Sequence, residues 1–134
     1  MVKRGWATRG KADSASLKAI DYGLSRARAL ARLGVGQTVI VKKNAVAAVE
    51  AMEGTDETIR RAGRWAGAGT IAVKVAGPRQ DWRFDVPTVG LKTIRSLAQA
   101  KARGIVVEAG RCFLLGGEKT VETADKEGIF MLAV

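Results

Sequence analysis

The sequence contains no histidine and a single cysteine, Cys112, among its 134 residues. A Cys/His zinc site and an internal disulfide are therefore excluded. Cys112 opens an apolar run that ends at residue 115, and no histidine is present to activate its thiol. We therefore expect a buried, inert thiol at this position rather than a nucleophile.

Long hydrophobic runs are also absent. No apolar run approaches the roughly 18 residues that a membrane-spanning helix needs. Residues 10–16 are polar, where a secretory signal would require an apolar core. We therefore expect a soluble chain located in the cytoplasm, and its length fits one domain.

Aromatic residues are few, at 5 %, and acidic residues number 13 against 23 basic ones, which gives a net charge of +10. Such a balance favours a polyanionic partner: nucleic acid, an anionic membrane or a phosphorylated metabolite. Single-stranded nucleic acid is usually bound by aromatic side chains arrayed along a basic groove. The low aromatic content makes nucleic acid the least favoured of the three.

Residues 1–13 are rich in basic residues and show no hydrophobic periodicity, so we expect a basic arm there. Hydrophobic periodicity predicts a single α/β domain over residues 14–134. The domain is expected to contain a mixed sheet, with about six strands and four helices in all. Helices are predicted over 14–33, 55–64, 91–103 and 118–126. Strands are predicted over 38–42, 45–51, 70–76, 105–109, 111–115 and 129–134, of which the first two and the fourth and fifth would form hairpins.

This order of elements suggests an internal pseudo-repeat, in which residues 47–51 correspond to residues 105–109. Each half would then contribute one carboxylate, Glu50 or Glu108, from an equivalent strand end to a shared site.

The loop from Gly77 to Gly90 contains both prolines of the chain and alternates charged with apolar residues. Its carboxylates Asp81 and Asp85 could form an all-oxygen site for Mg²⁺ or Mn²⁺. The further carboxylates that could join them are Glu50, Glu53, Asp56 and Glu108. The cations that could neutralise a phosphate are Lys74, Arg79 and Arg83. The spacing equally fits a structural ion-pair cluster that closes the loop.

A resemblance favours the functional interpretation. The segments that carry it are Gly36-Gln37, Ala48-Val49-Glu50-Ala51-Met52-Glu53-Gly54-Thr55-Asp56, Lys74-Val75-Ala76, Gln80-Asp81-Trp82-Arg83-Phe84-Asp85-Val86-Pro87-Thr88-Val89-Gly90 and Val107-Glu108-Ala109-Gly110. Together they resemble the C-terminal domain of the UDP-2,3-diacylglucosamine pyrophosphatases, of the type distinct from metallophosphoesterases. That family hydrolyses the pyrophosphate of UDP-2,3-diacylglucosamine to lipid X and UMP in lipid A biosynthesis, with a divalent cation.

The resemblance implies specific roles for individual residues. The expected catalytic residues are Asp81, Arg83 and Asp85. The expected substrate-binding residues are Gln37, Thr55, Lys74, Gln80 and Thr88. The expected ligands of Mg²⁺ or Mn²⁺ are Asp81, Asp85, Glu50 and Asp56.

The resemblance also implies partners. The family has an N-terminal domain that helps to enclose the substrate, and this chain begins near the start of the C-terminal domain. An N-terminal partner domain, a homodimer and a peripheral position at the inner membrane are therefore open expectations. The partner molecule would be UDP-2,3-diacylglucosamine or a related phosphosugar. The alternative function is a non-catalytic module, derived from that enzyme, that binds a nucleotide sugar or a phospholipid precursor.

Overall fold

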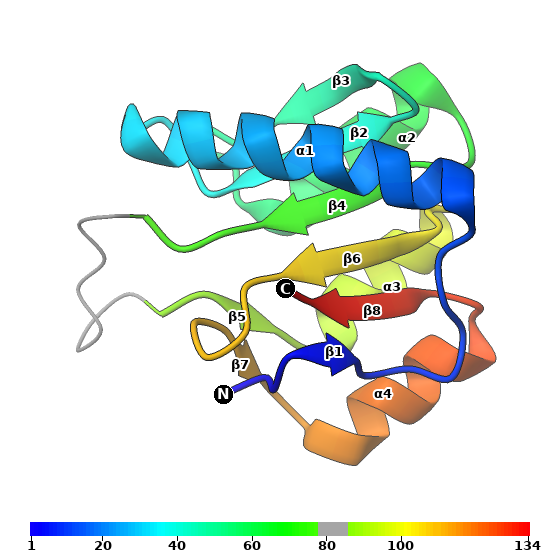
Figure 1. The fold of residues 1–134 in the computed structure, drawn as a ribbon. Helices are drawn as coiled ribbons and strands as arrows, with labels where there is room; N and C mark the ends of the chain where they lie inside the picture. The colour runs from blue at the N-terminus through cyan, green and yellow to red at the C-terminus, as the bar shows by residue number, and fades with distance from the viewer. Residues whose placement is uncertain (78–85) are drawn as a thin grey trace.

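The computed structural model describes residues 1–77 and 86–134 and shows three layers, with one central sheet between helices (Figure 1). The helices are α1 (Ser14–Arg32), α2 (Thr55–Ala66), α3 (Leu91–Gln99) and α4 (Gly117–Lys126). Helix α1 begins where the Asp13 side chain accepts a hydrogen bond from the Ser16 N–H at 2.7 Å, as a capping residue does. In the described part of the chain, no helix is long and apolar enough to cross a membrane.

The strands are β1 (Gly5–Trp6), β2 (Thr38–Lys42), β3 (Ala45–Val49), β4 (Ile71–Lys74), β5 (Thr88–Val89), β6 (Gly104–Val107), β7 (Phe113–Leu114) and β8 (Phe130–Ala133). Six of them form one sheet in the order β1-β8-β6-β4-β2-β3, and β5 pairs with β7 in a separate small sheet. Strands β4, β6 and β8 are mutually parallel, whereas β1 pairs antiparallel with β8, β2 with β4, and β3 with β2. The predicted mixed α/β class is confirmed.

Alternating side chains along the central strands divide the core into two halves. In β2, Val39 and Val41 pack under α1 with Leu24, whereas Ile40 points to the other face. That second face is covered by α2, α3 and α4, which supply Ile59, Ile94, Leu97 and Ala124. Burial on both faces explains why the parallel strands read as continuous apolar runs.

The first residues belong to the sheet, which corrects the expectation of a basic arm over residues 1–13. Gly5 pairs with Ala133 and Trp6 with Leu132, and Val2 is 8 % exposed in the core. Trp6 also packs edge-on against the Phe130 ring. A two-residue strand carries no detectable periodicity, so only the pairing with β8 reveals it.

The predicted hairpin over residues 105–115 is wrong. Strand β6 is hydrogen-bonded to β4 on one side and β8 on the other, so it has no free edge for an antiparallel neighbour. Strand β7 instead pairs with β5. The pseudo-repeat fails for the same reason, because β3 is an antiparallel edge strand whereas β6 is a central parallel one.

Candidate functional site

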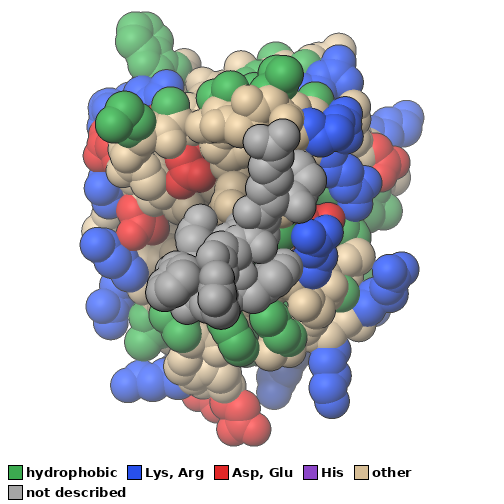
Figure 2. All heavy atoms as spheres, turned by 90° about the vertical axis from the view of Figure 1, so that its left-hand side faces the viewer, with side chains coloured by type: hydrophobic (Ala, Val, Ile, Leu, Met, Phe, Trp, Pro, Cys, Tyr) green, Lys and Arg blue, Asp and Glu red, His purple; other side chains and the backbone are tan. Residues whose placement is uncertain are grey.

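One edge of the sheet collects most of the residues singled out in the sequence. Thr38 pairs with Lys74, and Lys74 pairs with Val107, so β2 begins where β4 and β6 end. Strands β3 and β8 also end there, at Val49 and Ala133. This edge is the left-hand side of Figure 1 and faces the viewer in Figure 2. Ligands of open α/β sheets bind outside the carboxyl ends of the strands.

The N-termini of two helices make this edge of the sheet favourable for binding anions. Helices α2 and α3 precede β4 and β6, and they begin at the carboxyl-end edge (Figure 1). Their N-cap residues are Gly54 and Gly90, which have no side chain to cap the first-turn amides. Each helix end carries a partial positive charge of about half a unit. Amides that no N-cap side chain occupies, together with this charge, favour an anion at both helix ends.

Lys74 places a full positive charge between these helix ends. Its Nζ donates to Thr55 Oγ1 and to the Thr88 carbonyl oxygen, both at 3.1 Å. An ammonium group has three N–H donors. The third therefore has no partner among the described residues and remains available for a ligand oxygen.

Thr55 connects Lys74 to Glu50. The Thr55 hydroxyl accepts from Lys74 and donates to Glu50 Oε2 at 3.1 Å, while Thr38 Oγ1 lies 3.4 Å from the same hydroxyl. The other carboxylate oxygen of Glu50 accepts from the Gln37 N–H at 3.3 Å. These bonds fix the predicted substrate-binding residues Gln37, Thr55 and Lys74 in one network with Glu50.

Gly36 allows the loops of this network to approach. A Cβ built on Gly36 would lie 2.0 Å from the Glu50 carbonyl oxygen, far inside van der Waals contact. Only glycine permits this distance, so it sets the positions of Gln37 and Glu50.

Asp56 is the least satisfied of the described carboxylates at this edge. Its Oδ2 lies 3.8 Å from Lys92 Nζ on α3, so it joins the N-termini of the two helices. Its Oδ1 is buried and has no hydrogen-bond partner among the described residues. A buried carboxylate oxygen without a partner is costly, and it is a candidate for binding a cation.

Glu53, by contrast, is fully occupied by structural contacts. Hydrogen bonds from its own N–H and from the Ala51 N–H, joined by Arg61 and Thr58, hold the pKa of Glu53 at about 2. Its carboxylate therefore closes the turn between β3 and α2 as an anion.

Glu108 anchors the exit from β4. Its Oε1 accepts from the Ala76 N–H at 2.8 Å, and its Oε2 lies 4.0 Å from Arg28 Nε on α1. The sequence suggested Glu108 as a carboxylate of the site but gave no sign of its contact with Arg28. The contact between Arg28 and Glu108 could not be predicted from the sequence, because 80 residues separate them and no sequence motif contains both.

Cys112 is confirmed as buried, at 2 % exposed, and burial raises the pKa of its thiol to about 11. The thiolate is therefore scarce near neutral pH, in agreement with the expected inert thiol.

Gln80, Asp81, Arg79, Arg83 and Asp85 lie outside the described residues, and their predicted roles stay predictions. Within the described ranges, no group of three or more Cys, Asp or Glu side chains is arranged to hold a metal ion. Thr88 contributes its carbonyl oxygen, not its hydroxyl, to Lys74.

The fold defines an α/β domain whose carboxyl-end edge gathers two helix N-termini, Lys74 and several carboxylates. The family described as the LpxI C-terminal domain matches residues 3–132, and the chain belongs to this family. It is 40 % identical over 123 residues to the UDP-2,3-diacylglucosamine pyrophosphatase LpxI of Caulobacter vibrioides. The match covers 86 % of this chain but 44 % of the relative, so the chain spans less than half of that protein.

Proposed function

We propose that this domain takes part in hydrolysing the pyrophosphate bond of UDP-2,3-diacylglucosamine, giving lipid X and UMP in lipid A biosynthesis. Family membership and the name of the relative support this reaction. The observation that carries the proposal is Lys74, which lies between the N-termini of α2 and α3 and has one N–H without a partner among the described residues. A pyrophosphate needs such a concentration of positive charge.

In this proposal, each described residue of the network has a distinct task. Lys74 binds a phosphate oxygen as a point charge, and Thr55 fixes the direction of its ammonium group. Gln37 and Thr88 border the same space. Glu50 holds Thr55 and Gln37 through one hydrogen bond to each of its carboxylate oxygens, and each oxygen keeps a second lone pair for a metal ion.

The remaining tasks fall to the segment after Gly77. Asp81 is proposed as the leading catalytic carboxylate, with Asp85 beside it. Arg83 and Gln80 would contact the substrate, Arg83 through a bidentate pair of N–H donors.

A Mg²⁺ or Mn²⁺ ion fits the oxygen donors proposed for this edge. Mg²⁺ commonly binds through one or two protein carboxylates, with water and substrate phosphates completing its coordination. The unpartnered Oδ1 of Asp56 is such a donor, and Asp81, Asp85 and Glu50 are the other proposed ligands. When bound, the ion would polarise a phosphoryl oxygen and lower the pKa of a water molecule.

A separate N-terminal domain is proposed to complete the substrate site, since the chain covers 44 % of its relative. Around the edge, Met52 is fully exposed and Leu115 is 56 % exposed, and Figure 2 shows hydrophobic side chains above and below this face. Exposed apolar groups beside a polar site suit a second domain, a second copy of the chain or the acyl chains of the substrate. We further propose a cytoplasmic enzyme placed peripherally at the inner membrane, where its acylated substrate would be found.

The test is UMP release from UDP-2,3-diacylglucosamine with Mg²⁺ or Mn²⁺, measured with and without a separately produced N-terminal domain of the Caulobacter vibrioides relative. We expect release with the two domains together. Absence of release in every combination would contradict the hydrolase proposal. Saturable UMP binding without release would support the alternative, a non-catalytic nucleotide-sugar binding module.

A further inference from the structure

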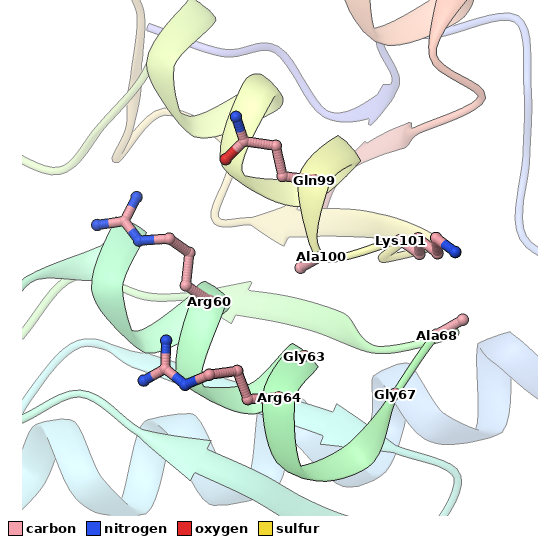
Figure 3. A pocket seen from close by; sticks show the side chains of 8 residues that line it. All are labelled: Arg60, Gly63, Arg64, Gly67, Ala68, Gln99, Ala100 and Lys101. Carbon is pink, nitrogen blue, oxygen red and sulfur yellow. The ribbon is translucent and has the colours of Figure 1, made fainter.

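A groove between the C-terminal halves of α2 and α3 has no role in the proposed reaction. Its volume is about 500 Å³, within the range of small-molecule sites. The lining residues are Arg60, Gly63, Arg64, Gly67, Ala68, Gln99, Ala100 and Lys101 (Figure 3). Helix α2 begins at the carboxyl-end edge and runs away from it for 12 residues, or about 18 Å. The end of the groove at Gly67 and Ala68 is therefore remote from Lys74.

The shape of the groove depends on small residues. A Cβ on Gly63 would lie 2.9 Å from the Cβ of Ala100, so the two helices approach more closely there than any other residue would allow. Gly67 and Ala68 then lead from α2 toward β4 without bulky side chains. The helices meet at Gly63, and long side chains stand on either side of this contact.

The charges that line the groove do not cancel. Three cationic side chains line the groove: Arg60, Arg64 and Lys101. One carboxylate, Glu57, lies beside them, so the net charge of these side chains is about +2. The C-terminus of each helix adds about half a negative charge. At α2 this end is already bound by Lys42, whose Nζ donates to the Ala66 carbonyl at 2.7 Å. A net positive charge of at least one unit therefore remains.

Glu57 orients both arginines to different degrees. Arg60 contacts Glu57 through Nε and Nη2 and donates from Nη1 to Ser96 Oγ at 3.5 Å, whereas Arg64 has nitrogens without a partner among the described residues. Arg60 and Arg64 each lie 3.2 Å from a different oxygen of Glu57, and their hydrogen bonds lower the pKa of Glu57. Arg64 uses only Nη2 for this contact, so its Nε and Nη1 donors have no partner in the described part of the chain. Figure 3 shows both arginines extending in one direction from α2, with the Gln99 amide on the facing helix.

We propose that this groove is a second anion site, which binds a small phosphate-bearing molecule through Arg60, Arg64 and Gln99. A phosphate group matches the planar fork of donors on Arg64 and accepts a further bond from the Gln99 amide. Lys101, at the other end of the groove, supplies charge for a second phosphate or an acidic group. The inference is independent of the proposed hydrolase function, because the two sites share no residue.

The test is a titration of the isotopically labelled chain with inorganic pyrophosphate at constant ionic strength, followed by amide chemical shifts. We expect saturable shifts at Gly63, Gly67, Ala68 and Lys101, separate from any shifts at Thr55 and Lys74. The double variant R60Q/R64Q should weaken binding at the groove amides at least about tenfold while leaving the edge amides unchanged. Unshifted groove amides, or equal affinity in the variant, would overturn the proposal.

Two further variants separate specific binding from general charge. The double variant R4Q/R32Q removes two exposed arginines outside the groove and should keep the groove affinity of the unsubstituted chain. An equal loss of affinity in this control would show general attraction and overturn the proposal. Gln99→Glu retains both arginines, so it leaves their contacts with Glu57 in place. It should nevertheless weaken pyrophosphate binding, and unchanged affinity would contradict the assigned role of Gln99.

Discussion

Replacement of Lys74 by methionine separates ligand binding from stability. The substitution keeps the length of the side chain and removes the ammonium group that donates to Thr55 Oγ1 and the Thr88 carbonyl. Each lost hydrogen bond to a charged group costs about 1.5–3 kcal/mol, but removing a partly buried charge returns part of this cost. We therefore expect a net loss of only about 1–2 kcal/mol of unfolding free energy.

The expected loss of ligand binding is larger. Lys74 supplies the full positive charge between the two helix N-termini, so K74M should weaken UMP binding by calorimetry at least about tenfold and reduce turnover about a hundredfold. Lys42→Met is the matched control, because Lys42 also donates to a carbonyl oxygen but lies at the opposite edge of the sheet. If K74M and K42M bound UMP equally well, Lys74 would have no role in ligand binding.

Further predictions concern the same edge. Gly36→Ala should destabilise the fold by about 1–3 kcal/mol and weaken UMP binding, because its Cβ would collide with the Glu50 carbonyl. Gly10→Ala, with open space around it, should change neither in denaturant and calorimetric measurements. Glu108→Ala should cost about 1–3 kcal/mol by leaving the Ala76 N–H without its acceptor. Glu108→Gln keeps an acceptor oxygen and should cost less; equal losses would contradict this role. The pKa of Glu53 is about 2 in the folded chain against an ordinary 4.5, so its stabilisation is present above pH 4.5 and is lost as the pH falls toward 2. The free energy of unfolding, measured with urea at about pH 5.5 and pH 2.5, should therefore fall less in E53Q than in the unsubstituted chain. The control E122Q, on an exposed face of α4, should lose as much free energy of unfolding as the unsubstituted chain.

Local patterns predicted most of the helices and strands, because their causes lie within a few residues. Helix α1 was predicted over 14–33 and ends at Arg32, since its apolar spacing and the Asp13 cap are both local. The hairpin of β2 and β3 was also predicted correctly from the turn at residues 43–44. Strand β1 and the position of β7 depend on pairing with distant segments, which no local pattern contains.

The candidate site could be predicted in part for the same reason. Lys74 is the last residue of β4 and Glu50 follows β3, and the topology brings these strand ends together at one edge. The contacts of Arg28 with Glu108 and of Lys92 with Asp56 join different elements across 80 and 36 residues. Such contacts depend on how helices pack on the sheet, so sequence spacing could not indicate them.

The most direct test of the central claim is to map where UMP binds, using the amide chemical shifts of the labelled chain. Binding at the carboxyl-end edge predicts the largest shifts at Gln37, Thr55, Lys74 and Gly90, with loss of saturation in K74M. Shifts confined to other surfaces, or unchanged saturation in K74M, would contradict the claim that this edge is the substrate site.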